Sequence, residues 1–265
     1  MKIKQKNTID MTHGTLWNKL LIFALPLAAS SILQQLFNSV DTAVVGRFAS
    51  SRALAAVGSN SSLIALMINL FIGISLGSNV IISRYIGQKA EEHVKGAIHT
   101  AIVVALCSGI FVLVLGQFIA RPVLTLMGTP KDVLDLAVLY LRIYFLGMPF
   151  IMLYDFSSSI LRSIGDSRRP LYALIAAGII NTGLNLILVI VFHLGVSGVA
   201  IATVVSNIVS SGILFYILLH EQEPIRVSLS GLSIDWGELK KILIIGVLPV
   251  CRAWSFPLPT SASRA

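Results

Sequence analysis

Three polar side chains, Gln34, Asn38 and Asp41, interrupt a long apolar stretch near the start of the chain. Their spacing places all three on one face of a helix, because residues four and seven positions apart line up along its axis. A carboxylate inside a membrane helix is costly and by default marks a functional site. We therefore expect Asp41 to bind a proton or a cation, with Gln34 and Asn38 supporting it. The structural alternative is a solvated carboxylate at the membrane surface, or a cap for the next turn near Gly46.

Two further pairs of polar residues have the same helical spacing inside apolar stretches. Asn181 precedes Asn185 by one helical turn, and Thr203 precedes Asn207 in the same way. Amide and hydroxyl oxygens can accept a cation, but such groups also hydrogen-bond neighbouring membrane helices, at roughly 1 kcal/mol per contact. Thr203 can also bond to its own helix. The residues alone leave a cation site and a packing role equally open.

Three other features lie within the apolar stretches. Asp155 is a second carboxylate in a predicted span and attracts the same functional interpretation, with an ion pair to Arg162 as the structural alternative. Pro26 removes a backbone hydrogen bond from the first stretch, so it predicts a helix hinge or a simple packing kink. Gly73 and Gly77 form a GxxxG pair, a weakly specific sign that two helices approach closely.

The composition is typical of a polytopic membrane protein. Of 265 residues, 55% are hydrophobic and 12% are charged, and the mean hydropathy is +0.86. Soluble domains carry roughly 25% charged residues, and an apolar run of about 20 residues spans a bilayer as a helix. The predicted fold class is all-α, a six-transmembrane-helix lobe followed by the start of a seventh helix near Leu239. The predicted spans are 16–40, 54–82, 97–119, 136–161, 171–192 and 199–219.

The net charge of +8 does not indicate a nucleic acid partner, because the basic residues lie in short loops beside apolar runs. In membrane proteins, Lys and Arg are enriched in cytoplasmic loops. A cytoplasmic N-terminus leaves only Arg47, Arg52, Arg121 and Lys131 in the outer loops, so we expect this orientation. The N-terminal segment lacks a short apolar core followed by a small-residue cleavage site, and the first span is expected to be retained.

The polar segment 221–238 contains the helix breakers Pro224 and Gly231. We expect it to form a cytoplasmic linker between a six-helix lobe at 1–220 and the start of a second lobe at 239–265.

The sequence from Lys19 to Pro26 has an echo from Lys241 to Pro249, a repetition typical of transporters built from two halves. Residues 249–265 then lose the helical pattern. We interpret them as an aberrant tail produced by a frameshift near Leu248, so that the rest of the second lobe is missing.

An enzyme is not expected. The segment Gly195-Val-Ser-Gly198 matches a pattern of intramembrane serine proteases, and His193 is nearby. However, the motif falls in a short loop where Gly and Ser form turns, and no later His lies inside a span to act as the base. Cys107 and Cys251 are far apart in the sequence and define neither a disulfide framework nor a metal site.

Several motifs, taken together and in order, resemble the multidrug and toxic compound extrusion (MATE) family. The resemblance covers residues 12–250. In the first half of the chain its segments are Leu25-Pro26 with Gln34, Asn38, Asp41 and Val45-Gly46; then Ala56-Val57-Gly58; then Tyr85-Ile86-Gly87 with Ala90; and then Pro122 with Leu126-Met-Gly-Thr-Pro130. In the second half they are Tyr140-Leu-Arg142; then Leu161-Arg162 with Gly165-Asp166 and Pro170; then Asn181; and then Gly198 to Thr203. It implies two six-helix lobes and the export of drugs or organic cations in exchange for Na+ or H+.

The resemblance also implies a cation- or proton-binding site formed by Asp41, Asn181, Asn185 and Thr203. It implies no cofactor, no metal other than Na+ at this site, and Na+ or H+ as the coupling ion. Relatives often carry Asp at the position matching Asn185, so this site has one carboxylate fewer, which leaves the coupling ion open. The expected location is the bacterial cytoplasmic membrane. The expected partners are the lipid bilayer, a small organic cation or drug, and the missing C-terminal lobe.

The expected function is therefore a cation-coupled antiporter that works by alternating access and that is inactive as a single lobe. A flippase for a lipid-linked saccharide has a related architecture, but it usually lines its cavity with more cationic residues than these spans hold. The remaining alternative is a truncated membrane protein that does not transport, which the aberrant tail favours.

Overall fold

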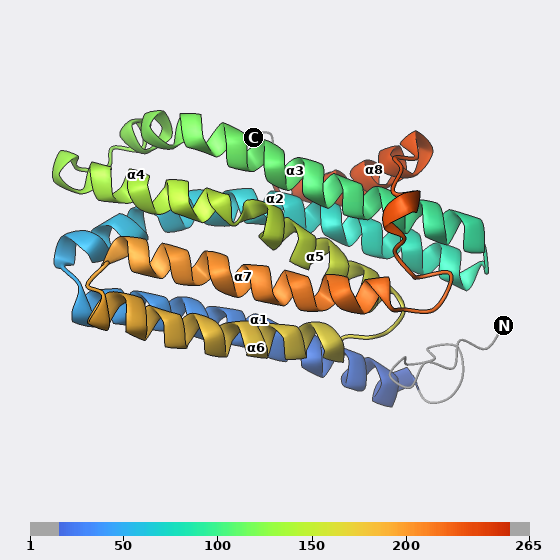
Figure 1. The fold of residues 1–265 in the computed structure, drawn as a ribbon. Coiled ribbons are helices and arrows are strands. Elements are labelled where there is room, and N and C mark those ends of the chain that lie inside the picture. The colour runs from blue at the N-terminus through green and yellow to red at the C-terminus, as the bar shows by residue number, and fades with distance from the viewer. Residues whose placement is uncertain (1–15, 255–265) are drawn as a thin grey trace, which may run out of the picture.

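The computed structural model describes residues 16–254, except for the side chains at positions 16, 230 and 247–254, and every regular element within this range is helical. The helices run side by side along one long axis (Figure 1). In chain order they are α1 (Leu16–Phe48), α2 (Ser51–Gly87), α3 (Glu91–Leu126), α4 (Lys131–Leu146), α5 (Met148–Ser163), α6 (Arg168–Leu186) with its π-helical extension η1 (Ile187–Val191), α7 (Val196–Leu219), the 3-10 helix η2 (Leu229–Gly231) and α8 (Trp236–Trp254).

The helices confirm an all-α polytopic membrane protein. Five of them are long and apolar enough to cross a bilayer, and a bent pair, α4 with α5, makes a sixth span. The helices extend beyond the predicted spans at several ends, most clearly α2 with 37 residues and α3 with 36. Because an α-helix rises 1.5 Å per residue, both project past a hydrocarbon core of about 30 Å.

The span predicted at 136–161 is present, but it is broken into two helices, which the sequence did not predict. The chain bends by 48° between α4 and α5, and Pro149 occupies the first turn of α5. Proline has no backbone N–H to continue the hydrogen bonds of α4, but it is well tolerated in a first helical turn. At Gly109 of α3 an added Cβ would lie 2.5 Å from the Cα of Pro149, so α3 packs directly on the break.

The bend brings α5 into the centre of the bundle, where it packs against α2, α3 and α7. Side chains along its whole length are fully buried, among them Met152, Phe156 and Ile160. In contrast, α1 packs mainly on α6 and leaves a row of large apolar side chains exposed: Trp17, Leu20, Leu21, Leu25, Ile32 and Leu36.

The turn between α5 and α6 explains why the sixth helix begins where it does. Gly165 has φ of 83°, a left-handed conformation that favours glycine. The carboxylate of Asp166 accepts hydrogen bonds from the backbone N–H groups of Arg168 and Arg169, at 3.0 and 3.1 Å. It therefore caps the N-terminus of α6. Arg169 also contacts Asp166 and lies 2.8 Å from Glu221, which ties the end of α7 to this turn.

Residues 220–235 connect α7 to α8 and dock on α3, so the last three residues of the linker predicted at 221–238 already belong to α8. The Ser228 backbone N–H donates to Nε2 of His99 at 3.1 Å, and the Asp235 N–H donates to the Thr100 hydroxyl at 3.0 Å. Beyond this segment α8 packs on α2. The helix continues past Pro249 to Trp254, whereas the rest of the tail that we interpret as aberrant lies outside the described residues.

Glycines allow α2 and α8 to cross in close contact. An added Cβ at Gly246 would lie 2.6 Å from the Cα of Ile74, and one at Gly77 would lie 2.8 Å from the backbone N of Gly246. The Gly73–Gly77 pair therefore lies at this crossing, which joins the six-span bundle to the following helix.

Candidate functional site

Asp41 lies in α1, and its carboxylate contacts two residues of α6. The side-chain amide of Asn185 donates hydrogen bonds to Asp41 Oδ1 and, at 3.1 Å, to Oδ1 of Asn181. Asn185 is fully buried and Asn181 is 5% exposed. The helical spacing of the two asparagines thus places both amides toward α1. Asp41 is not a cap, because α1 continues to Phe48.

Thr203 brings α7 into the same group. The amide of Asn181 lies 3.5 Å from the Thr203 hydroxyl, which itself donates to the Val199 carbonyl at 2.9 Å. We call Asp41, Asn181, Asn185 and Thr203 the Asp41 cluster. The structure therefore brings together, from three helices, all four residues that the resemblance implied.

The Asp41 cluster contains a negative group but no fixed positive group. No ion pair among the described residues involves Asp41. The side-chain hydrogen bond that Asp41 accepts comes from Asn185, and both N–H donors of Asn185 are already used. Oδ1 of Asn185 is buried and has no hydrogen-bond partner among the described residues. Isolated charges and unpaired polar atoms are costly when buried. A small cation, bound by the free amide oxygen and the carboxylate, or a proton on the carboxylate, would offset that cost.

A glycine notch in α6 sets the distance between α1 and the Asp41 cluster. The ring of Phe37 lies where a Cβ would stand on Gly178. Phe37 precedes Asp41 by one helical turn, and Gly178 precedes Asn181 by three residues. The contact between the Phe37 ring and the α6 backbone therefore lies directly beside the cluster. Our sequence reasoning did not include Gly178, although a small residue on the face of Asn181 and Asn185 could have indicated it.

The other residues predicted to support the site do not contact it. Gln34 and Asn38 are exposed on α1, and no side-chain hydrogen bond between described residues links either of them to Asp41. Asn207 donates to the Thr203 carbonyl at 2.8 Å and so bonds to its own helix. At Pro26, α1 continues without interruption, and the Ser30 hydroxyl donates to the Pro26 carbonyl at 2.8 Å.

Asp155 does not form the ion pair with Arg162 that would explain it structurally. Oδ2 of Asp155 and Nε of Arg162 are both buried and both lack a hydrogen-bond partner among the described residues. The backbone carbonyl of Asp155 accepts a hydrogen bond from Ser75 of α2 at 3.0 Å. Asp155 thus lies in the α2–α5 interface rather than in the Asp41 cluster, and its supporting role stays a prediction.

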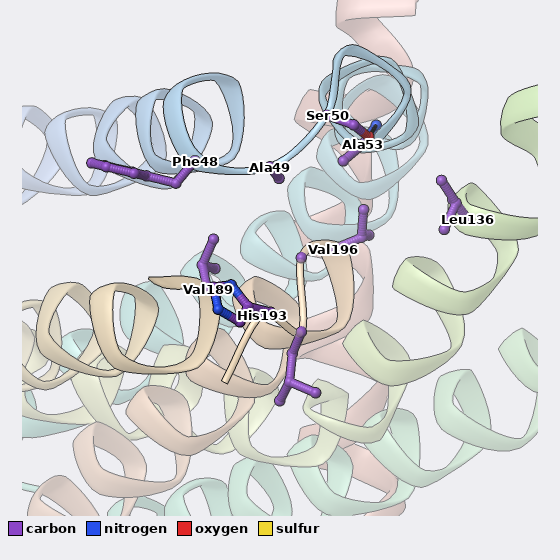
Figure 2. Close-up of a pocket in the computed structure, with 10 residues that line it drawn as sticks. Phe48, Ala49, Ser50, Ala53, Leu136, Val189, His193 and Val196 are labelled. Carbon is purple, nitrogen blue, oxygen red and sulfur yellow. Dashed lines mark hydrogen bonds between the residues drawn. The ribbon is translucent and has the colours of Figure 1, made fainter. Parts of the chain in front are cut away.

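A cavity of about 280 Å³ lies at the end of the bundle where α1 meets α2 and η1 meets α7 (Figure 2). His193 lines it with Phe48, Leu136 and Val196, but Ser197 does not. No hydrogen bond between described residues joins His193 to Ser197. Of the motif that matched a serine protease, only Gly195, at φ of 54°, lies in the turn that we expected, whereas Ser197 lies in the first turn of α7. The motif is therefore a helix start and not a nucleophile paired with a base.

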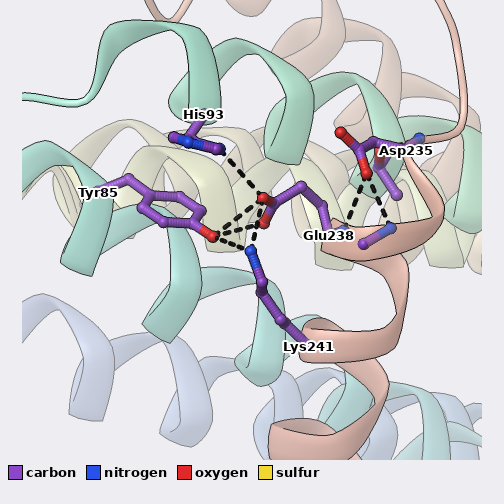
Figure 3. A network of polar contacts seen from close by, with 7 residues as sticks. Tyr85, His93, Asp235, Glu238 and Lys241 are labelled. Carbon is purple, nitrogen blue, oxygen red and sulfur yellow. Dashed lines mark hydrogen bonds and ion pairs between the residues drawn. The ribbon is translucent and has the colours of Figure 1, made fainter.

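Another carboxylate, Glu238 at the start of α8, is buried at the opposite end of the bundle (Figures 1 and 3). The Tyr85 hydroxyl lies 2.8 and 2.9 Å from its two oxygens, and Nζ of Lys241 lies 2.9 Å from Oε1. Nδ1 of His93 lies 3.3 Å from the same oxygen. We call Tyr85, His93, Glu238 and Lys241 the Glu238 network. The residues come from α2, α3 and α8, so the network fixes α8 to the bundle.

Comparison with known sequences gives matches over most of the chain. The family model described as MatE matches residues 26–187. The Bacillus subtilis protein named probable multidrug resistance protein YoeA is 35% identical over 83% of this chain and 48% of its own length. The B. subtilis protein named probable multidrug resistance protein YpnP is 29% identical over 90% of this chain and 53% of its own. The chain thus spans about half the length of these relatives.

Solved structures give the same result. A structure described as MATE in the bent conformation is 25% identical, with a TM-score of 0.82 over 88% of this chain and 52% of the other. A multidrug resistance MATE family transporter is similar in its outward-facing conformation (TM-score 0.80, 25% identity, 86% and 51% of the two chains) and in its inward-facing one (0.74, 25%, 80% and 49%). The six-span bundle therefore has the arrangement of one half of these proteins.

Proposed function

The chain belongs to the MATE family of efflux transporters, and from this premise we propose that it forms the N-terminal lobe, residues 1–220, of a cation-coupled drug antiporter. The linker 221–238 and the segment from 239 onward lead into a second lobe. The observation that carries the proposal is the contact of Asp41 with Asn185 across α1 and α6. Within the described part of the chain, this contact leaves the Asp41 carboxylate without a counterion, next to an amide oxygen of Asn185 that has no hydrogen-bond partner. The multidrug names of the relatives support drugs and organic cations as the exported substrates.

The Asp41 cluster binds the coupling ion. Binding of Na+ or a proton neutralises Asp41 and changes the hydrogen bonds that join α1 to α6 and α7. An ion shifts a conformational equilibrium only if it binds the two states differently, and a site shared by three helices meets this requirement when the helices move. Because Asn185 supplies an amide and not a second carboxylate, one positive charge is sufficient to balance the site.

The uncovered face of α1 faces the substrate pathway between the two lobes. Gln34 and Asn38 are exposed there among apolar side chains, which suits organic cations with apolar bodies. Pro26 allows α1 to bend when Asp41 binds or releases its ion. A flippase for lipid-linked saccharides would place cationic side chains on such a face, and the amides of α1 do not supply them.

The N-terminus faces the cytoplasm of a bacterial cell. The start of α1 and the α7–α8 connection lie at one end of the bundle (Figure 1), and most basic residues near helix ends belong to the helix ends and loops of this same end. This distribution is typical of cytoplasmic loops. We call this the basic end, formed by Lys19, Arg84, Lys89, Lys95, Arg162, Arg168, Arg169, Arg226, Lys240 and Lys241.

Ion binding is testable on the purified chain. A ligand that binds only the folded state raises the unfolding midpoint in proportion to the logarithm of its concentration. We expect Na+ to stabilise the chain more than choline at equal ionic strength, or protons to do so as the pH falls. A midpoint that follows ionic strength alone, whatever the cation or the pH, would exclude the site.

Asn185→Asp distinguishes the two coupling ions. A second carboxylate beside Asp41 strengthens the binding of a cation, so Na+ should stabilise the variant more than the native chain at high pH. If instead only the pH dependence changes, the site is a proton site.

Transport needs two lobes. In cells, the 265-residue chain alone should not export a dye such as ethidium, whereas a longer protein that adds a second six-helix lobe should. Asp41→Asn should abolish export by the longer protein without lowering its level in the membrane. Export by the short chain would contradict the two-lobe mechanism, and full export by the variant would contradict the role of Asp41.

A further inference from the structure

A second cavity, of about 390 Å³, opens between α2 and α8 at the basic end. It is separate from the Asp41 cluster, because none of the four cluster residues lines it. Its lining combines positively charged, polar and branched apolar side chains, namely Arg84, Lys241, Tyr85, Gln88, Ile81, Ile244 and Ile245. This combination suits a ligand with an anionic group at one end and an apolar body.

Arg84 supplies a free positive charge. It is exposed in the last turn of α2, and no ion pair or side-chain hydrogen bond between described residues involves it. A guanidinium group carries five N–H donors in a planar fork that matches phosphate oxygens. The amide of Gln88, the residue that follows the last residue of α2 and is also exposed, can add a donor to the same oxygen atoms.

Lys241 of α8 lines the cavity together with Arg84 of α2 and has one donor to spare. Its ammonium carries three protons, of which one is directed to the Tyr85 hydroxyl at 2.7 Å and one to Glu238 at 2.9 Å. Glu238 offsets the charge of Lys241, but its side chain is only 3% exposed, so it is not presented to the cavity. The cavity mouth therefore keeps a net positive charge, to which the exposed Lys89 and Lys240 add nearby.

The apolar part of the cavity continues onto the outer surface of the helices. Ile81 is buried at its base, whereas Ile244 is 48% exposed on α8. Trp236, in the first turn of α8, is 75% exposed, and exposed Trp residues are typical of the membrane–water interface. A ligand with its charged group at Arg84 would thus extend its apolar part along α8, into the region that lipid tails occupy.

We propose that this cavity binds the phosphate group of an anionic phospholipid from the cytoplasmic leaflet, between Arg84 and Lys241, with an acyl chain against Ile244. Basic pockets between membrane helices on the cytoplasmic side are suited to such head groups. Because the cavity is built from α2 and α8 together, the lipid also holds the second-lobe helix against the first lobe. Free phosphate shares the charged contacts but not the apolar ones.

Native mass spectrometry of the purified 265-residue chain measures this binding. Phosphatidylglycerol and phosphatidylcholine with identical acyl chains are added in equal amounts. We expect phosphatidylglycerol to be retained in preference, and an excess of inorganic phosphate to displace little of it. Equal retention of the two lipids, or full displacement by inorganic phosphate, would overturn the lipid site.

Arg84→Gln removes the free charge, and Lys240→Gln is its matched control. Lys240 is an exposed cation on α8, next to Lys241, but it does not line the cavity. One Lys or Arg near a membrane surface contributes about 1 kcal/mol to the binding of anionic lipid, a roughly five-fold effect. We expect Arg84→Gln to weaken retention by about five-fold and Lys240→Gln to change it much less. Equal losses in the two variants would mean diffuse surface attraction and would overturn the site.

Gln88→Glu provides a second variant that keeps the shape of the cavity wall. Gln88 is exposed, so the variant should fold, which size-exclusion chromatography verifies. A carboxylate in this position repels the lipid phosphate, and selectivity for phosphatidylglycerol should be lost. Unchanged selectivity in a folded Gln88→Glu variant would contradict the proposal. None of these measurements depends on transport or on Asp41, so the outcome is independent of the proposed antiport.

Discussion

Two regions of the molecule hold a carboxylate between helices that are distant in sequence, and the two carboxylates differ in the groups that surround them. Glu238 is 2% exposed and has a Tyr hydroxyl, a Lys ammonium and a His ring within hydrogen-bond distance. Between the described residues, Asp41 accepts only from the neutral amide of Asn185, whose own oxygen has no hydrogen-bond partner there. Within this part of the chain, Glu238 has a permanent counterion in Lys241, and Asp41 has none.

The difference indicates two kinds of role. A carboxylate whose lone pairs and charge are matched by fixed groups has nothing to gain from a mobile ion, so the Glu238 network acts as a structural joint. A carboxylate held in place by neutral donors has a fixed position, but no positive group balances its charge. It is therefore suited to bind and release a proton or a cation. The comparison predicts that changes at Asp41 affect ion response, whereas changes at Glu238 affect stability.

The largest expected effect is the loss of ion response in Asp41→Asn. The amide keeps the size of the side chain but removes the negative charge, so the stabilisation of the purified chain by Na+ or by protons should disappear. Thermal unfolding in detergent, at a series of Na+ concentrations and pH values, measures it. Glu238→Gln is the control and should keep the response of the native chain. Loss of the response in both variants would break the distinction between the two regions.

Glu238→Gln should have the next largest effect, on stability. An amide cannot accept from Tyr85 and Lys241 through both oxygens, so a buried donor or acceptor loses its partner, at a cost of about 1–3 kcal/mol. We expect α8 to detach more easily, seen as faster proteolysis of residues 221–238 and a lower unfolding midpoint. Native-like protection of this linker would show that the glycine crossing of α2 and α8 is sufficient alone.

Gly178→Ala tests how the Asp41 cluster is positioned. The new methyl group would overlap the Phe37 ring, and overpacking of this kind costs about 1–3 kcal/mol. Displacement of α1 should also weaken ion binding several-fold.

Gly183→Ala is the matched control on the same helix, because no atom lies within 4 Å of a Cβ at Gly183. Ala is favoured over Gly in a helix, so this variant should be neutral or slightly stabilising in the same measurements. Equal effects of the two variants would contradict the positioning role of Gly178.

The smallest effect is expected for Lys95→Gln at the basic end. Lys95 forms an ion pair of 2.8 Å with Glu223, but both side chains are well exposed. Exposed ion pairs contribute little, and salt screens them. The unfolding midpoint and the protection of the linker should match those of the native chain at physiological ionic strength. A loss as large as that of Glu238→Gln would mean that the linker, and not the buried network, holds α8.

The sequence predicted the elements well, because each depends on local properties. Apolar length defines a span, and the helical spacing of Asn181 and Asn185 places two amides on one face whatever the rest of the fold does. The broken span was missed at Gly147 and Pro149, since a proline near the middle of an apolar run is compatible with both a kink and a break. In the structure, α3 packs against this break at Gly109.

The sequence alone determined that this is a helical membrane protein, that Asp41 is a costly charge, and that few residues are chemically able to serve it. Only the tertiary structure decided which of these residues contact Asp41. Asn185 contacts Asp41 across 144 positions of sequence and Tyr85 contacts Glu238 across 153, distances at which local pattern carries no information. Glycines set both contacts. One lets the Phe37 ring pack on α6, and others let α8 pack closely on α2, because helices must lie close together before short polar side chains can meet.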